Sequence, residues 1–204
     1  MNPLTQYISS QFRNPRGFAG SIISLVQNIV NEKMYKNAVA LVNLEDNEKV
    51  LDIGYGNGHL LEMIYKKRAV DMYGIDISED AKEMATKKNR QAYAKNQLHL
   101  EVGDCCALPY ENDTFSAVTS INTVYFWEDI VKGLSEIRRT LKSGKSFYNV
   151  VYSREYLDTV RYTQIGYKKF TIEELIQYGE MAGFSKVELK DIVKGKSFVV
   201  IYTK

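Results

Sequence analysis

The stretch that decides the fold of this chain is Val50-Leu51-Asp52-Ile53-Gly54-Tyr55-Gly56-Asn57-Gly58-His59-Leu60-Leu61. Its apolar start predicts a buried strand, and the glycines at every second position predict a tight turn into a helix. Glycine suits such a turn because it adopts backbone angles that a Cβ would block, and because a ligand can lie against bare backbone. Since the unpaired N–H groups of the following helix point at the turn, the stretch predicts a nucleotide-like ligand.

The glycine spacing distinguishes between kinds of nucleotide site. A dinucleotide site carries G-x-G-x-x-G, but the position of its third glycine is occupied here by His59. No Lys-Ser or Lys-Thr pair follows, so the phosphate loop of nucleoside triphosphatases is absent as well. Asp52, at the end of the strand, would repel a pyrophosphate but could help hold an ammonium group. The stretch therefore favours a ligand with an amino-acid end, and an NAD(P)-dependent Rossmann oxidoreductase is the alternative.

Length and composition indicate a single compact globular domain. The chain has 204 residues, of which 45% are hydrophobic and 25% charged, with a formal net charge of +2. Neither nucleic acid nor a membrane is needed as a partner at this charge, and the oligomeric state is left open. The adjacent Cys105 and Cys106 lack the spacing of a zinc site, so no metal is predicted. No signal core or membrane-spanning run is found, which predicts a cytoplasmic protein.

From residue 49 onward, predicted strands and helices alternate as in a parallel sheet flanked by helices. Before that, apolar residues predict helices over 22–30 and 34–42 with their apolar sides packed on the sheet edge, while the turn-rich stretch 11–20 predicts no helix. Residues 1–47 are expected to form a helical cap or lid, and residues 48–204 the ligand-binding domain. Further along, we expect one helix over 78–96, a capping box at Thr171-x-x-Glu174 and a hairpin turning at 193–196.

Acidic and amide residues follow the predicted strands at the points where a parallel sheet places its ligands. Asp76 ends the second strand, twenty residues after Gly56, a spacing suited to a carboxylate that accepts both ribose hydroxyls. Capping the next helix is the other role open to Asp76, although Ser78 suits that role better. Asp104 follows the third strand, where it is either a ligand acceptor or a solvated loop residue. Asn122 follows the fourth strand.

The glycine turn, Asp52-Ile53-Gly54-Tyr55-Gly56-Asn57-Gly58, resembles D-x-G-x-G-x-G, the first motif of the class I S-adenosylmethionine-dependent methyltransferases. Residues 103–109 are similar to the G-D-x-x-x-L-P stretch of that family, and residues 122–127 to the N-x-x-x-F-W stretch of its small-molecule members. The resemblance implies an α/β, Rossmann-like, doubly wound sheet of seven mostly parallel strands in the order 3-2-1-4-5-7-6, with an antiparallel C-terminal hairpin and N-terminal helices. It also implies methyl transfer from S-adenosylmethionine to a small-molecule acceptor by in-line displacement.

The resemblance also implies which residues bind the cofactor. Ile77 would lie against the adenine ring, Asp104 would accept from its amine, and the Cys105 backbone would donate to a ring nitrogen. Asn122 would lie where the methionine end of the cofactor meets the acceptor. The implied cofactor-binding residues are Asp52, Gly54, Tyr55, Gly56, Gly58, Asp76, Ile77, Asp104, Cys105 and Asn122. A cofactor-binding domain that transfers no methyl group is the non-enzyme alternative.

The sequence defines the binding site of the methyl acceptor less well than that of the cofactor. Methyl transfer needs no universal base, and His59 and Tyr125 are the candidates, although packing explains His59 better. Of the aromatics at 125–127, at least one should line the site, where its π-face could attract a sulfonium. Tyr125, Trp127 and Tyr152 are the expected acceptor contacts. Arg154 and Arg161 could grip an anionic acceptor, but a solvated loop explains them as well. Quinol, phenol, thiol and amine acceptors all stay open.

Overall fold

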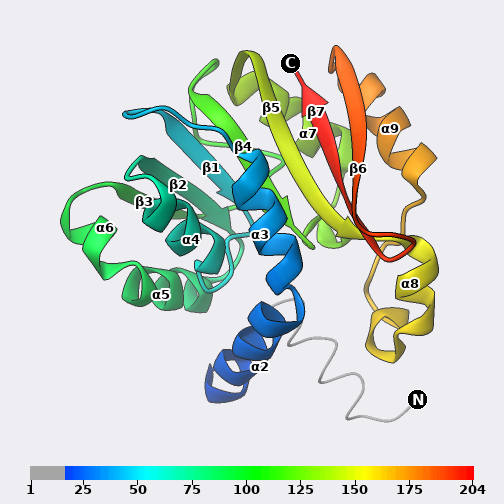
Figure 1. Ribbon diagram of the computed structural model, residues 1–204, viewed down its shortest axis with the longest axis horizontal. Helices are drawn as coiled ribbons and strands as arrows, with labels where there is room; N and C mark the ends of the chain where they lie inside the picture. Colours follow the sequence, from blue (N-terminus) through cyan, green and yellow to red (C-terminus); the bar gives the residue numbers. More distant parts are fainter. Residues whose placement is uncertain (1–16) are drawn as a thin grey trace.

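Figure 1 shows a computed structural model of the protein, which describes residues 17–204. The strands are β1 Lys49–Ile53, β2 Asp71–Asp76, β3 Leu98–Val102, β4 Phe115–Ile121, β5 Leu141–Tyr152, β6 Lys186–Val193 and β7 Ser197–Thr203. The helices are α2 Gly17–Val30, α3 Glu32–Leu41, α4 His59–Lys67, α5 Glu79–Lys88, α6 Arg90–Ala94, α7 Ile130–Thr140, α8 Arg154–Thr159 and α9 Ile172–Met181, with short 3-10 helices η1 Val124–Phe126 and η2 Arg161–Gln164. None of these helices is long and apolar enough to cross a membrane.

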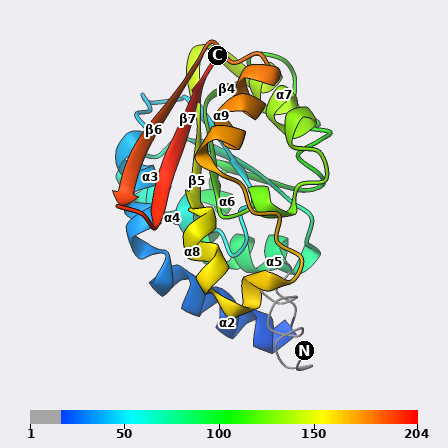
Figure 2. The ribbon, with the colours of Figure 1, turned by 90° about the vertical axis from the view of Figure 1, so that its right-hand side faces the viewer.

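The strands form a single seven-stranded sheet in the order β3-β2-β1-β4-β5-β7-β6. The pairs on either side of β7 are antiparallel, and the other pairs are parallel. Figure 2 shows the sheet between two layers of helices, with α3 and α4 on one side and α7 and α9 on the other. The predicted Rossmann-like, doubly wound fold with its C-terminal hairpin and N-terminal helices is confirmed.

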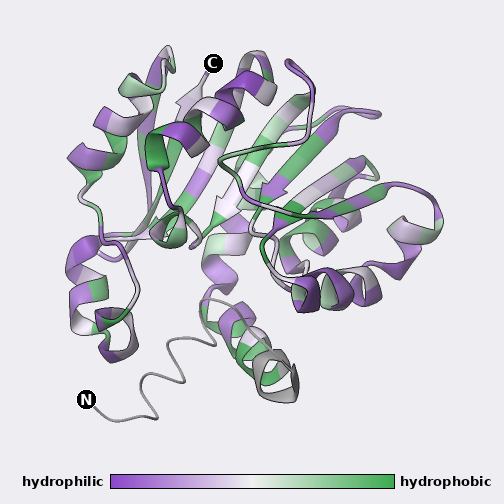
Figure 3. Ribbon diagram, turned by 180° about the vertical axis from the view of Figure 1, so that it is seen from behind, coloured by the Kyte–Doolittle hydropathy of each residue, from purple (hydrophilic) through white to green (hydrophobic). Residues whose placement is uncertain are grey.

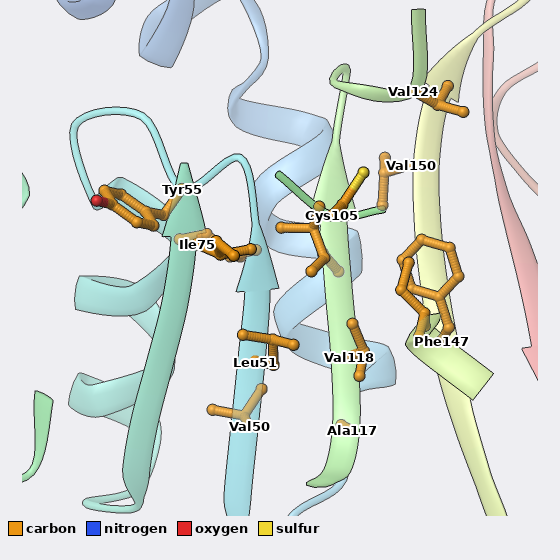
Figure 4. Close-up of a cluster of buried hydrophobic side chains, with 14 of the residues drawn as sticks. Val50, Leu51, Tyr55, Ile75, Cys105, Ala117, Val118, Val124, Phe147 and Val150 are labelled. Atoms are coloured by element: carbon orange, nitrogen blue, oxygen red, sulfur yellow. The ribbon is translucent and has the colours of Figure 1, made fainter. Parts of the chain in front are cut away.

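The hydrophobic core forms because helices cover both faces of the sheet. β4 and β7 are buried along six successive residues each, as expected for strands with helices on both sides. Figure 3 shows the hydrophobic colour concentrated in the middle of the sheet, and Figure 4 shows the side chains of this cluster. In that cluster Tyr55 lies beside Ile75 near the end of β2, so the first residue after Gly54 is part of the core.

The first helix differs from the prediction. α2 begins at Gly17, so residues 17–20 are helical where the turn-rich composition predicted no helix. The remaining residues of the turn-rich stretch, 11–16, lie outside the described residues. The two helices are separated by Asn31, and α3 packs as predicted, with Met34 and Ala38 buried. The proposed division into a lid over 1–47 and a domain over 48–204 stays a prediction.

The apolar side of α2 does not pack on the sheet, so that prediction is wrong. Leu25 and Ile29 are 59% and 72% exposed, whereas Ser24 and Asn28 are buried. The reason is the position of the helix: Figures 1 and 2 show α2 crossing the end of the molecule between α5 and α8, where the carboxyl ends of the parallel strands lie. The polar side of α2 therefore faces the protein.

The helix predicted over 78–96 is divided at Asn89 into α5 and α6. The Asn89 side chain is buried and donates from Nδ2 to the carbonyl oxygen of Gly58 at 3.0 Å. This bond fixes the end of α5 against the glycine turn. A contact with a residue 31 positions away has no local sequence signal, so the division was not predictable from helical periodicity.

The predicted capping box at the start of α9 is confirmed. Thr171 Oγ1 accepts from the Glu174 N–H at 3.2 Å, and Glu174 Oε2 accepts from the Thr171 N–H at 2.8 Å. We expect Thr171→Ala to lower the free energy of unfolding by about 1 kcal/mol, because the Glu174 N–H loses its side-chain acceptor. Urea unfolding measures the change. Thr159→Ala, at the exposed end of α8, is the control and should change stability by less than about 0.5 kcal/mol. Equal losses in the two variants would contradict the capping role.

Candidate functional site

The three glycines of the turn have left-handed backbone angles, with φ of 70°, 51° and 72° at Gly54, Gly56 and Gly58. A Cβ on Gly54 would lie 2.9 Å from Thr123 Cβ, and one on Gly58 would lie 2.9 Å from Ala85 Cβ. These two glycines therefore allow close packing against the end of β4 and against α5. A Cβ on Gly56 would meet no heavy atom within 4 Å. Gly56 thus presents its backbone to open space.

That open space is a cavity of about 310 Å³ at the carboxyl ends of the parallel strands. It lies at the reversal of strand order between β1 and β4, where open α/β sheets bind ligands. The structure brings most of the sequence-predicted cofactor residues together in its wall: Gly54, Tyr55, Gly56, Asp76, Ile77, Asp104, Cys105 and Asn122. Asp52 and Gly58 do not line it. Trp127 is the predicted acceptor contact that does.

Asp76 is held at the cavity by backbone N–H groups. Its Oδ2 accepts from the Gly56 N–H at 2.9 Å and its Oδ1 from the Ser78 N–H at 3.0 Å. Burial raises the pKa of the Asp76 carboxyl, while these N–H bonds act in the opposite direction. Ser78 caps α5, accepting from the Ala81 N–H at 3.3 Å. The helix cap is thus supplied by Ser78, and the Asp76 carboxylate joins the end of β2 to the glycine turn.

The wall beyond Asp76 combines an exposed apolar side chain with an exposed acid. Ile77 is 55% exposed at the rim of the cavity, where an apolar side chain suits contact with a flat ring. Asp104 Oδ1 accepts from the Cys106 N–H at 2.9 Å. Burial raises the pKa of both the Cys105 and Cys106 thiols. Ligand atoms of Asp104 and these cysteines lie within 4.8 Å of one another, and the raised pKa values keep both cysteines protonated as thiols in the absence of a cation.

Asp52 lies beneath the turn rather than on the cavity wall. It is 3% exposed, and its Oδ1 accepts from the Thr119 hydroxyl at 2.8 Å. Burial raises the pKa of the Asp52 carboxyl to about 7, the Thr119 bond opposes this, and the charge of Asp76 adds to it. The predicted contact of Asp52 with an ammonium group stays a prediction, and the described wall does not include its side chain.

His59 joins two helices outside the cavity wall. Its Nε2 lies 3.7 Å from Glu32 Oε2 on α3, and its Nδ1 lies 3.6 Å from Glu62 Oε2 on α4. The ring also packs edge-on against Tyr35, with centroids 4.9 Å apart. These contacts favour the packing role that the sequence suggested over proton transfer.

Tyr125 and Tyr152 lie behind the cavity wall. The Tyr125 hydroxyl accepts from the Tyr152 N–H at 2.7 Å and donates to Asn122 Oδ1 at 3.2 Å. The Tyr152 hydroxyl donates to Asn31 Oδ1 at 2.7 Å. Burial raises the pKa of the Tyr125 hydroxyl well above its usual value, which disfavours a role as base. The two tyrosines instead link the α2–α3 junction at Asn31 to Asn122 on the wall.

Sequence reasoning missed the wall that α2 provides. Ser24, Gln27 and Asn28 of α2 line the cavity, together with Asn31 directly after the end of the helix. Their spacing of i, i+3, i+4 and i+7 places them on one helix face, and this polar repeat was the available signal. The apolar residues were instead assigned to the buried face, as in an ordinary surface helix. Arg154 and Arg161 do not line the cavity.

Comparison with known proteins finds similar methyltransferases. Residues 50–144 match the model of a methyltransferase domain. The chain is 29% identical over 133 residues to a demethylmenaquinone methyltransferase of Symbiobacterium thermophilum, covering 64% of this chain and 53% of that protein. It is 31% identical over 147 residues to a chloroplastic 2-methyl-6-phytyl-1,4-hydroquinone methyltransferase of Oryza sativa, covering 71% of this chain and 43% of that protein. The chain thus spans about half the length of these curated relatives.

Solved structures share the fold over nearly the whole chain. A SAM-dependent methyltransferase from Aquifex aeolicus superposes with a TM-score of 0.72 at 19% identity, covering 91% of this chain and 98% of that one. A Haloferax volcanii protein solved in complex with the Trm112 methyltransferase activator has a TM-score of 0.75 at 19% identity, covering 100% and 99%. The matched domain, the strand order and these structural likenesses all agree with the motifs that the sequence carries at the strand ends. The matched domain over residues 50–144, the strand order and the motifs at the strand ends make this chain similar to the class I S-adenosylmethionine-dependent methyltransferases.

Proposed function

We propose that this chain transfers a methyl group from S-adenosylmethionine to a small-molecule acceptor in the cytoplasm. The observation that carries the proposal is the single cavity into which the glycine turn, Asp76, Asp104 and Asn122 converge. Two relatives are named for methyl transfer to demethylmenaquinone and to a phytyl hydroquinone, which supports a small-molecule acceptor.

The residues present fit the cofactor. A Cβ on Gly56 would project into open space, so with glycine at this position a ligand can lie against the backbone. Asp76 would accept from the ribose hydroxyls, with Ile77 against the adenine ring. Asp104 and the Cys105 backbone would pair with the adenine edge, and Asn122 would lie near the methionine end. When bound, the cofactor supplies an electrophilic methyl group on a sulfonium.

The protein's part in such a reaction is alignment. Because the leaving group departs without charge, no residue has to stabilise a new anion, and holding two reactants in line can supply roughly 7–11 kcal/mol. The wall residues orient the cofactor, and α2 crosses the end of the sheet beside the same cavity. His59 and Tyr125, the two candidate bases, lie outside the wall of the cavity. Neither residue is therefore expected to take a proton from the acceptor.

Two measurements test the proposal. Isothermal calorimetry with S-adenosylhomocysteine should show one binding site per chain, and a chain that bound NADH instead would support the oxidoreductase alternative. Detection of S-adenosylhomocysteine after incubation with S-adenosylmethionine and a panel of phenols, hydroquinones, thiols and amines should show turnover. Binding without turnover of any of them would favour a non-catalytic domain.

The Gly56 backbone gives a specific prediction. Gly56→Ala should weaken S-adenosylhomocysteine binding by about tenfold or more, because the new methyl group occupies the space beside the turn. Gly195→Ala is the matched control, since Gly195 also has a left-handed φ of 70° and open space around a Cβ, but lies in the β6–β7 turn. In both variants, backbone strain should lower the free energy of unfolding by a similar amount, about 1 kcal/mol, which urea unfolding measures. Equal affinities in the two variants would contradict the placement of the ligand against Gly56.

A further inference from the structure

Three side chains of the kind that bind metals lie together after the end of β3. Ligand atoms of Asp104, Cys105 and Cys106 all lie within 4.8 Å of one another. The loop holds them in place, because Asp104 Oδ1 accepts from the Cys106 N–H at 2.9 Å. In a tetrahedral zinc site, sulfur bonds of about 2.3 Å place two sulfurs about 3.8 Å apart. Small side-chain rotations therefore bring the three groups to bonding distance of one cation.

Both thiols face α7. Cys106 Sγ lies 3.3 Å from the carbonyl oxygen of Asp129, the residue that caps this helix. Cys105 Sγ lies beside Gly133, where an added Cβ would be 3.4 Å from the sulfur. Adjacent residues of an extended chain point in opposite directions, but packing against one helix turns these two thiols the same way. The two sulfurs are thus placed to share a ligand.

The cavity gives a cation access to this group. Asp104 and Cys105 line the cavity, and Asp104 is exposed whereas both cysteines are buried. In the part of the chain that the structure describes, the charged residues of the wall are Asp76, Asp104 and Glu128. Because all three are acids, the wall attracts cations.

We infer that Asp104, Cys105 and Cys106 bind one sulfur-preferring divalent cation, of the Zn²⁺ and Cd²⁺ class, and that this cation and the cofactor exclude each other. Two sulfurs and one carboxylate oxygen suit such cations and not Mg²⁺ or Ca²⁺, which prefer oxygen ligands. The cation displaces the proton of each thiol to water, so the raised pKa values of the cysteines lower the affinity without removing the site. The spacing of the cysteines alone predicted no metal, and the structure adds Asp104 and the shared direction of the thiols.

The exclusion follows from the two oxygens of Asp104. Oδ1 is already bonded to the Cys106 N–H, which leaves Oδ2 for either the cation or the adenine amine. This part of the inference rests on the proposed function, which assigns Asp104 and the Cys105 backbone to the adenine edge. The cation site itself does not depend on that function.

Titration of the reduced chain with Cd²⁺ tests the cation site. The ultraviolet absorption of cadmium–thiolate bonds should reach a plateau at one Cd²⁺ per chain. Cys106→Ser should weaken Cd²⁺ binding by at least about 100-fold, since the loss of an outer-shell partner alone costs roughly 10–100-fold. An absence of this absorption, or an affinity that Cys106→Ser leaves unchanged, would overturn the site.

A second pair of variants tests the carboxylate. Asp104→Asn should weaken Cd²⁺ binding by about tenfold or more. Glu111→Gln removes an exposed acid of the same loop, so it is the matched control and should leave the Cd²⁺ affinity unchanged. Circular dichroism checks that each variant is folded. Equal Cd²⁺ affinities in the two variants would exclude Asp104 as a ligand.

Calorimetry with S-adenosylhomocysteine tests the exclusion. Saturation of the wild type with Cd²⁺ should lower its affinity for S-adenosylhomocysteine by about tenfold or more. The Cys106 side chain is not part of the described cavity wall. Cys106→Ser should therefore bind S-adenosylhomocysteine within about twofold of the metal-free wild type, with or without the same Cd²⁺ concentration. An unchanged affinity in the Cd²⁺-saturated wild type would overturn the exclusion. If the metal-free wild type binds no S-adenosylhomocysteine, the proposed function fails and the exclusion fails with it, while the Cd²⁺ titration still decides the cation site.

Discussion

Asp76→Asn is expected to weaken S-adenosylhomocysteine binding by about 100-fold, a loss of roughly 2.7 kcal/mol. The proposed role of Asp76 is to accept from two ribose hydroxyls, and each hydrogen bond to a charged group contributes about 1.5–3 kcal/mol. An asparagine keeps the shape of the side chain and one acceptor oxygen, so the loss should fall between one such bond and two. Calorimetry measures the affinity directly.

The control for this variant is Asp71→Asn. Asp71 begins the same strand, β2, and pairs with Lys49 at the far end from the cavity. The affinity of the Asp71→Asn variant for S-adenosylhomocysteine should therefore equal that of the wild type. The Asp76 carboxylate also accepts from the Gly56 and Ser78 N–H groups, and circular dichroism should therefore confirm that the turn and α5 are intact. An Asp76→Asn variant that folds and binds with wild-type affinity would exclude the ribose role.

The parts of the fold that were predictable are those determined by local sequence. Alternating apolar runs and helical patterns gave the strands, and the hairpin and the capping box have short-range signals at residues 193–196 and Thr171. The strand order came from the resemblance of the glycine turn to a known motif, since spacing alone does not order seven strands. Eight of the ten predicted cofactor residues line the cavity because each follows a strand end, and parallel strands bring those ends together.

The parts that were not predictable depend on distant contacts. The orientation of α2 is set by the cavity that it borders, and an amphipathic pattern indicates two faces without saying which one faces the protein. Tyr125 was expected at the acceptor because three consecutive aromatic residues cannot all face the core, and Tyr152 because it lies at the end of the fifth predicted strand. Their positions behind the wall follow from hydrogen bonds to Asn122 and Asn31, residues that belong to other elements of the fold.

The burial of Asp52 has a consequence for stability. In the unfolded chain an aspartate has a pKa of about 3.9, whereas in the folded protein burial raises the pKa of Asp52 to about 7. Between these values the folded protein holds a proton on this carboxyl that the unfolded chain has released. The unfolded state is then favoured progressively as the pH rises, and the free energy of unfolding falls through this window by up to roughly 4 kcal/mol.

Asp52→Asn should remove this pH dependence, because an amide does not titrate. The difference in unfolding free energy between variant and wild type should therefore grow in favour of the variant from about pH 4 to pH 7 and then level off. Urea unfolding across this range measures it, and using the difference cancels the titration of the groups that do not interact with Asp52; the titration of Asp76, whose charge acts on Asp52, is not cancelled. Any constant offset reports how well the amide replaces the carboxyl beside Thr119, whose hydroxyl donates to Asp52 Oδ1 at 2.8 Å. Parallel curves for the two proteins would show that Asp52 titrates normally, and would mean that water or a cation reaches the carboxylate beneath the glycine turn.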